Sequence, residues 1–166
     1  MESLDYLLKI VAKISPSPIE NLQVEEQNID YEGVTFSLGN QTFRSRKAKV
    51  TPKKSGYFVV FWEKDDNNKN QPYESTGAPD NLVITVLDQE KSGQFIFPKE
   101  ILIKKNILTD GEAKGKMALR VYPEWVTGLN KTASATQEWQ KPYFVDLTNT
   151  WDLKRLEDIY FNQSKK

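Results

Sequence analysis

One stretch near the middle of the chain reads Asn81-Leu82-Val83-Ile84-Thr85-Val86-Leu87-Asp88. Its apolar residues are nearly continuous instead of alternating with polar ones, so a strand formed here must be covered on both faces. Such a strand lies in the middle of a sheet. We therefore predict an α/β (α+β) fold, with a mixed central β-sheet flanked by helices.

The other elements are predicted by working outward from this strand. Apolar residues at helical spacing indicate a first helix, which ends at Ser15-Pro16-Ser17-Pro18. Gly39-Asn40 is typical of a hairpin turn. No repeat or long linker interrupts residues 1–166, so we expect one domain. The expected elements are a helix at 2–14, strands at 33–38, 41–50 and 57–63, a mobile loop at 64–80, strands at 81–88 and 94–97, a helix at 98–105, a strand at 117–122, a helix at 132–141, a short apolar piece at 143–147 and a C-terminal helix at 149–163.

The 166-residue chain contains neither cysteine nor histidine. Without these residues, disulfides, cysteine nucleophiles, zinc–thiolate sites, Ser–His–Asp triads and imidazole bases are excluded. Any catalysis would rest on carboxylates, lysine, tyrosine, hydroxyl groups or a metal held by oxygen. The N-terminus lacks a secretory pattern and no apolar run is as long as a membrane span, so we expect a cytoplasmic protein with no membrane partner.

The formal net charge is zero, with 23 basic and 23 acidic residues, but the charges are unevenly distributed. Residues 1–43 hold two lysines and seven acids, whereas residues 44–120 hold 15 basic and 10 acidic side chains. Residues 121–166 hold six of each. The neutral total therefore does not argue against a polyanionic partner. The acidic N-terminal segment is a candidate to screen the basic region from unspecific binding.

The strongest local signal is a run of six cations without an acid between residues 44 and 54. Alternate residues of a strand share a face, so Arg44 and Arg46 should point one way, and Lys47 and Lys49 the other. Aromatic residues lie close by, and cations beside aromatic rings suit the phosphates and bases of single-stranded nucleic acid. The alternative is a solvated lysine face with the aromatic residues in the core. The six cations are Arg44, Arg46, Lys47, Lys49, Lys53 and Lys54.

A second set of residues combines a carboxylate with a lysine. Asp88 ends the central strand, and Phe97-Pro98-Lys99 ends the next one. An acid on each strand with a nearby lysine would hold Mg²⁺ against a phosphate, but a phenylalanine takes the place of the second acid. Asp88 and Lys99 are thus degenerate catalytic candidates, or else a turn residue and a surface residue. Pro79-Asp80 followed by Glu90-Lys91 resembles a similar signature, but the intervening residue is missing and we interpret the match as coincidence.

Aromatic residues form a third set. Arg120-Val121-Tyr122-Pro123-x-Trp125 ends a predicted strand, and Trp139-Gln140-x-x-Tyr143 lies on or just after a predicted helix. Arg120 adds a cation for nucleic acid. The two tryptophans, with Tyr57 and Trp62, are candidates for stacking on bases. The alternative is that these rings pack in the core, where aromatic residues bury the largest areas.

Several of these blocks together resemble the MepB family. The blocks follow the family order from about residue 33 to 147, so the resemblance covers most of the chain. They are Phe43-Arg44-x-Arg46-x-Ala48-Lys49-x-Thr51-Pro52-x-Lys54-x-Gly56-x-Phe58-Val59-x-x-Trp62, Gly93-x-Phe95-x-Phe97-Pro98-Lys99, Arg120-Val121-Tyr122-Pro123-x-Trp125 and Trp139-Gln140-x-x-Tyr143-Phe144.

The resemblance implies a core like that of the PD-(D/E)XK nucleases, in which a helix, three strands, a helix and a strand follow one another. The family is named after a gene beside a multidrug efflux pump and its repressor. In the implied alignment, Asp88 takes the metal-binding position and Lys99 that of the motif lysine. Phe97 replaces the second acid, which argues against nuclease chemistry.

We therefore predict a non-catalytic domain with a nuclease-like fold that binds nucleic acid through its basic strand, tolerates many sequences and needs no cofactor or metal. Lys99 and Arg120 would add to the six cations of the strand. Two alternatives stay open. The first is an active nuclease dependent on Mg²⁺ or Mn²⁺, with Asp88 and either Glu26 or Glu32 in the metal shell. The second is a protein-interaction module linked to the efflux regulatory locus.

Overall fold

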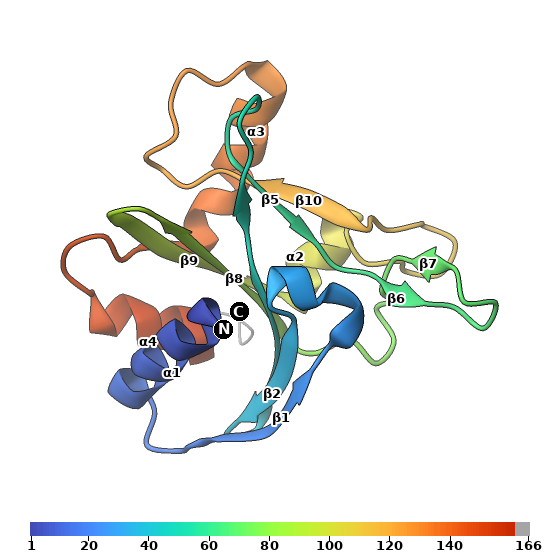
Figure 1. Ribbon diagram of the computed structural model, residues 1–166, viewed down its shortest axis with the longest axis horizontal. Helices are drawn as coiled ribbons and strands as arrows, with labels where there is room; N and C mark the ends of the chain where they lie inside the picture. The colour runs from blue at the N-terminus through green and yellow to red at the C-terminus, as the bar shows by residue number, and fades with distance from the viewer. Residues whose placement is uncertain (162–166) are drawn as a thin grey trace.

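The strand at residues 81–88 lies at the centre of the sheet, as predicted. In this computed structural model, which describes residues 1–161, β8 (Asn81–Asp88) pairs in parallel with β3 (Gln41–Lys47) and antiparallel with β9 (Lys91–Pro98) (Figure 1). The first six residues of β8 are buried, because both faces of the sheet are covered. The six-stranded order is β1-β2-β3-β8-β9-β11, with β1 at Ile19–Val24, β2 at Val34–Leu38 and β11 at Phe144–Asp146.

Two helices cover one face of this sheet. α1 (Glu2–Ile14) and α4 (Leu153–Phe161) contact each other on that face (Figure 1). Leu7 and Ile10 of α1 and Leu156 of α4 are fully buried, and they pack against alternate residues of β2, β3, β8 and β9. Helices this short are stabilised mainly by packing of their apolar side, so the sheet holds them in place.

The opposite face is covered by α2 (Lys99–Lys104) and by a small second sheet (Figure 1). This sheet has the strand order β10-β5-β4, formed by Ala118–Val121, Tyr57–Val60 and Lys49–Val50. Its inward side chains join those of β8 and β9 in a second core that is rich in aromatic rings. The fold is therefore the predicted mixed α+β domain, with a central mixed sheet flanked by helices.

Two segments have more structure than predicted. β1 is an edge strand with five of its six residues exposed, so it lacks the alternating apolar pattern by which a strand is predicted, and η1 (Glu26–Tyr31) follows it. Residues 64–80, predicted as a loop, contain β7 (Asn70–Gln71), which pairs with β6 (Glu63–Lys64). Tyr73 from the same segment is buried in the second core.

The predicted helices are confirmed, with small shifts at their ends. α4 begins at Leu153 instead of near residue 149, because Asp152 caps it by accepting a hydrogen bond from the backbone N–H of Arg155. Residues 162–163 of the predicted helix lie outside the described residues. Within residues 1–161, no helix combines the length and the apolar character needed to cross a bilayer. α3 spans Lys131–Gln140 and is followed by the 3-10 turn η2 at Lys141–Tyr143.

A short chain of polar groups lies inside the core that the sheet forms with α1 and α4. The hydroxyl of Tyr160 donates a hydrogen bond to Oε1 of Gln94 (2.5 Å), and Nε2 of Gln94 donates to the hydroxyl of Thr85 (2.9 Å). All three side chains are buried. Because water does not reach them, each depends on its partner within the protein.

Replacing Tyr160 by phenylalanine is expected to lower the free energy of unfolding by about 1–3 kcal/mol, because Oε1 of Gln94 then stays buried without a donor. Urea denaturation should show a lower midpoint with an unchanged slope. Tyr6→Phe is the matched control, since its hydroxyl donates to Ser92 (2.9 Å) but is only half-buried. Equal losses in the two variants would show that burial does not set the cost.

Candidate functional site

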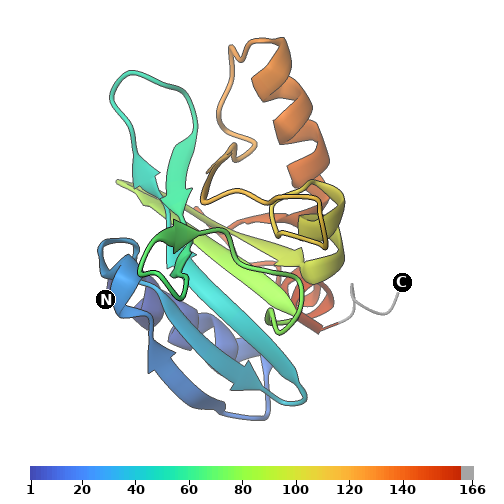
Figure 2. The same cartoon turned by 90° about the vertical axis from the view of Figure 1, so that its right-hand side faces the viewer.

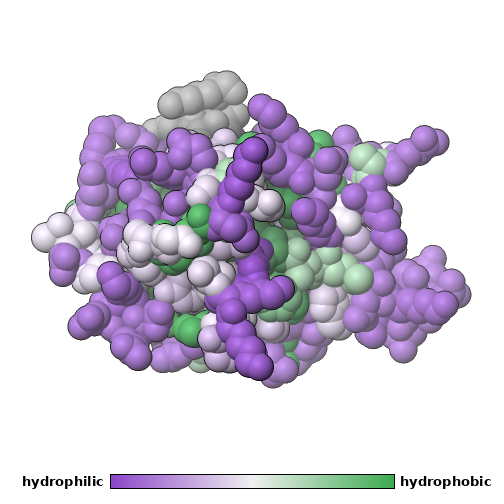
Figure 3. Space-filling view, turned by 90° about the horizontal axis from the view of Figure 1, so that it is seen from above, coloured by the Kyte–Doolittle hydropathy of each residue, from purple (hydrophilic) through white to green (hydrophobic). Residues whose placement is uncertain are grey.

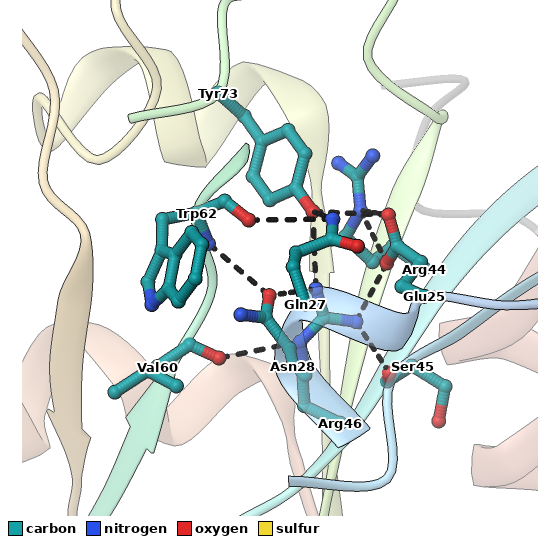
Figure 4. Close-up of polar contacts among 9 residues, drawn as sticks. All are labelled: Glu25, Gln27, Asn28, Arg44, Ser45, Arg46, Val60, Trp62 and Tyr73. Atoms are coloured by element: carbon teal, nitrogen blue, oxygen red, sulfur yellow. Dashed lines mark hydrogen bonds and ion pairs between the residues drawn. The ribbon is translucent and has the colours of Figure 1, made fainter. Parts of the chain in front are cut away.

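The predicted basic strand spans β3 and β4, and its six cations have very different surroundings. Arg46 is fully buried, with an exposed fraction of 0%. All five of its N–H donors have acceptors within the fold (Figure 4). The acceptors are a carboxylate oxygen of Glu25 (2.7 Å), Oδ1 of Asn28 (2.6 Å), the hydroxyl of Tyr73 (3.2 Å) and the carbonyls of Ser45 (2.9 Å) and Val60 (3.2 Å). The predicted phosphate contact of Arg46 is therefore wrong, because its guanidinium has no donor left for a ligand.

Arg44 is half-buried and shares the same carboxylate. Its Nε donates to both oxygens of Glu25 (3.0 and 3.3 Å), and its guanidinium carbon lies 3.5 Å from the centroid of the Tyr73 ring. The hydroxyl of Tyr73 also donates to Glu25 (2.9 Å). We call Glu25, Asn28, Arg44, Arg46 and Tyr73 the buried charge network (Figure 4). It joins the junction of β1 and η1 to the middle of the sheet.

The pKa of Glu25 is set by opposing effects. Burial by itself would raise this pKa, but the charges of Arg46 and Arg44 and their hydrogen bonds outweigh burial and hold the pKa below its ordinary value. Burial raises the pKa of Tyr73. At neutral pH the carboxyl group is therefore ionised and the phenol is neutral, so the network contains paired charges.

Lys47 points to the other face of β3, as predicted, and reaches the start of α1. It forms ion pairs with Glu2 and, at 3.7 Å, with Glu32. The hydrogen bond from Lys47 to Glu2 raises the pKa of this lysine. Half of the six cations are thus paired with acids of the N-terminal segment. These ion pairs are the contacts that screening would require, and the screening itself stays a prediction.

The other three cations of the strand are exposed. Lys49, Lys53 and Lys54 belong to residues 49–60, which we call the basic hairpin because β4 and β5 pair there. Within residues 1–161, none of the three forms an ion pair. The hairpin projects from the body of the protein (Figures 1 and 2). Seen from that end, long hydrophilic side chains surround smaller hydrophobic patches (Figure 3).

The outer face of the small sheet alternates cations with aromatic rings. The register places Lys49 opposite Phe58, and Phe58 opposite Arg120. Nζ of Lys49 lies 4.4 Å from the centroid of the Tyr31 ring, and the guanidinium carbon of Arg120 lies 5.5 Å from that of Phe58. The two rings meet edge to face, with centroids 6.4 Å apart. We call these four residues the cation–aromatic row, in which positive charge is held against half-exposed rings.

A cavity of about 310 Å³ adjoins this row, because Arg120 belongs to both. The cavity lies between the end of α2, β10 and α3. Lys105 and Lys116 bring two further cations to it, and Trp139 brings an indole ring. No carboxylate lines the cavity, and within the described part of the chain its three cations form no ion pair. Its walls are basic, aromatic or neutral, so its electrostatic potential favours an anion.

Asp88 and Lys99 do not form one site, and the structure agrees with the alternative of a turn residue and a residue in the first turn of a helix. β8 and β9 are antiparallel, so Asp88 lies opposite Lys91 at the turn, whereas Lys99 follows the far end of β9. Asp88 instead accepts a hydrogen bond from the hydroxyl of Tyr57 (2.7 Å). The full length of the β-hairpin separates the two candidate residues.

Asp80, which follows Pro79, is hydrogen-bonded to Lys99 through the backbone, whereas its carboxylate binds another strand. The backbone N–H of Lys99 donates to the carbonyl of Asp80 (2.8 Å), and the Asp80 carboxylate accepts hydrogen bonds from the N–H and hydroxyl of Thr42 (2.9 and 3.2 Å). Within residues 1–161, no three acidic side chains are grouped so as to hold a metal ion. The metal shell outlined around Asp88 is therefore not assembled among these residues.

The four predicted stacking residues also differ in their surroundings. Tyr57 is buried in the second core, so the stacking role predicted for it is wrong, and its hydroxyl accepts a hydrogen bond from the indole N–H of Trp125 (2.9 Å). Trp62 borders the buried charge network (Figure 4). Trp139 lines the cavity and packs on Phe97, with ring centroids 5.5 Å apart. Each of the three tryptophans has a lysine Nζ near its ring centroid, Lys64 at 5.2 Å from Trp62, Lys91 at 5.4 Å from Trp125 and Lys105 at 5.4 Å from Trp139, and of the three it is Trp139 that lines the cavity.

Three residues of the site are not predicted from the sequence. Tyr31, Lys105 and Lys116 come from separate parts of the chain, and only the fold brings them to the basic hairpin and the cavity. Nζ of Lys105 lies 5.4 Å from the centroid of the Trp139 ring. The one signal in the sequence that bears on these lysines is the excess of basic residues over residues 44–120.

The fold and the site together define a mixed α+β domain with an exposed basic and aromatic surface. The MepB-like family matches residues 25–146, and the chain belongs to this family. The crystal structure of MepB is similar to this chain, with 49% sequence identity and a TM-score of 0.79 over 90% of this chain and 99% of that one. Comparison with curated proteins found no match.

Replacing Glu25 by alanine is expected to lower the free energy of unfolding by about 3–5 kcal/mol at neutral pH, because two guanidinium groups lose the anion between them. The folded-state pKa of Glu25 lies below its ordinary value of 4.5, so its stabilisation is present above that pH and is lost as the pH falls through the folded-state pKa. Urea denaturation from pH 7 to about pH 3 should therefore show the two proteins converging in acid.

Glu20→Ala is the matched control for Glu25→Ala, since Glu20 is an exposed residue of β1, the strand that ends just before Glu25. It should change the free energy of unfolding by less than about 0.5 kcal/mol. A difference between Glu25→Ala and the parent protein that stays constant down to the lowest pH would contradict the assigned role of the carboxylate.

Proposed function

We propose that this protein binds nucleic acid through its basic hairpin and cation–aromatic row, and that it does so without cleaving the strand. The main support for the proposal is that the cations of one basic strand fall into two groups, those paired with acids and those left unpaired. The cations that face the body of the protein are paired with acids, whereas those of the hairpin are exposed and lack acidic partners in residues 1–161. A surface that keeps unpaired cations attracts a polyanion.

The rings of the cation–aromatic row support nucleic acid over other polyanions. Lys49 and Arg120 are each held against a half-exposed ring, so charge for a phosphate and a flat surface for a base are only a few ångströms apart. This combination is typical of proteins that bind single strands with little regard to sequence. Contacts of this kind release counterions, so binding should weaken steeply as salt is added.

Charge reversal in the hairpin tests the proposal. Lys49→Glu combined with Lys54→Glu should weaken binding of a fluorescein-labelled 20-nucleotide strand by at least about tenfold at low salt, measured by fluorescence anisotropy. The slope of the logarithm of affinity against the logarithm of salt concentration should become shallower by about 1.4, because two phosphate contacts with a single strand are lost.

Lys9→Glu combined with Lys13→Glu is the matched control, because it changes the net charge equally but alters exposed residues of α1 on the opposite face of the sheet. Its affinity should stay within about threefold of the parent protein. Equal losses in both double variants, or no binding by the parent protein at low salt, would disprove the proposal. The same strand incubated with Mg²⁺ or Mn²⁺ should stay intact, and cleavage would favour the nuclease alternative.

A further inference from the structure

The cavity beside Arg120 differs from the rest of the basic surface in size and in shape. Its volume of about 310 Å³ is at the lower end of the range for small-molecule sites, and it is too small for a double helix. One unpaired nucleotide, with a flat base and one phosphate, is a ligand of suitable size and chemistry.

The cations of the cavity come from three different segments. Lys105 is the C-cap residue that follows α2, Lys116 lies in the loop before β10, and Arg120 lies within β10. Arg120 is held in place from the side of the basic hairpin, because its Nη1 donates to the hydroxyl of Thr51 (3.0 Å) and to the carbonyl of Ser55 (3.1 Å). Three positive charges around a small space, without a carboxylate in its walls, form a site suited to a phosphate.

Trp139 provides the aromatic surface. It is half-buried and packs on the fully buried Phe97 and on Lys105, so the core fixes the position of the indole while part of it lines the cavity. A base that stacks on an indole contributes binding energy whatever its identity, because every base has a π-face. A ring supported by the core loses little freedom when a ligand binds.

Two of the uncharged polar side chains that line the cavity, Gln140 and Thr136, already form hydrogen bonds within the fold. The Gln140 amide accepts a hydrogen bond from the N–H of Tyr122 (2.9 Å) and donates one to the carbonyl of Arg120 (3.0 Å). The hydroxyl of Thr136 donates to the carbonyl of Thr132 (3.2 Å). The Gln140 amide thus holds α3 on β10 and is not available to a ligand. The cavity offers positive charge and an aromatic ring, but few groups that would distinguish one base edge from another.

From these observations we infer that the cavity binds one unpaired nucleotide, with its base on Trp139 and its phosphate among Lys105, Lys116 and Arg120. The inference rests on the proposed function and adds to it a preference for single strands over duplexes, since a base within a duplex is not accessible to an indole. The same chemistry would also accept a free nucleoside monophosphate. A strand and a free nucleotide are therefore tested separately.

The experiment compares a labelled single strand with its duplex for the parent protein and two cavity variants. Trp139→Leu and, separately, Lys105→Glu with Lys116→Glu should each weaken binding of the single strand by about 5- to 100-fold and change binding of the duplex by less than about threefold. Trp139→Phe keeps an aromatic ring and should recover most of the affinity lost in the leucine variant.

A second arm titrates AMP and CMP into the same proteins and follows backbone amide shifts by NMR. Shifts at residues lining the cavity, absent in the lysine double variant, would identify a nucleotide site even if no oligonucleotide binds. Single-strand binding that is unchanged in both cavity variants, with no AMP-induced shifts, would overturn the cavity site but leave the hairpin proposal standing. Absence of oligonucleotide binding together with AMP-induced shifts would reject the hairpin proposal and assign the cavity to free nucleotides.

Discussion

The carboxylate of Glu25 is the group on which the rest of the structure depends. Arg44 and Arg46 lie on one face of β3, and two guanidinium groups cannot be buried side by side without an anion between them. Glu25 supplies this anion from the junction of β1 and η1, so ion pairs join this junction to β3 in addition to the pairing of β1 with β2. Tyr31 at the end of η1 is thereby held beneath Lys49. The buried charge network thus helps to form the exposed cation–aromatic row.

The ion pairs of the N-terminal acids explain how a protein with zero net charge can still have a basic surface. The acids of the N-terminal segment are not spread evenly over the protein, because Glu2, Glu25 and Glu32 bind the cations that face the interior and α1. The basic residues of the hairpin and the cavity are left without acidic partners in residues 1–161. The three acids and the three cations of these ion pairs cancel one another, so the protein stays neutral in total while the hairpin and the cavity keep a local positive charge.

The sequence predicts much of the fold, because apolar periodicity depends on local spacing. The central strand at residues 81–88 and the helix at residues 2–14 follow directly from such spacing. β1 is not predicted, because an exposed edge strand has no apolar pattern. The alternation of residues in β3 predicts that Arg44 and Arg46 share a face, but not that a carboxylate distant in sequence meets them there. For the same reason the sequence identifies the basic hairpin but not Lys105 and Lys116, which only tertiary contacts bring to the site.

Phe97 bears on both functional hypotheses for this protein, the metal-dependent nuclease and the nucleotide-binding cavity. In the alignment implied by the nuclease motif, this position would carry the second acid, next to Lys99. In the structure Phe97 is fully buried and packs on Trp139 and Tyr143, with ring centroids 5.5 and 5.8 Å away. A carboxylate here would be surrounded by rings and left without a partner, at a cost of several kcal/mol. The residue that stands where the implied alignment would place a metal ligand is therefore the residue that supports the indole of the cavity, which is the ring that the proposed nucleotide site requires.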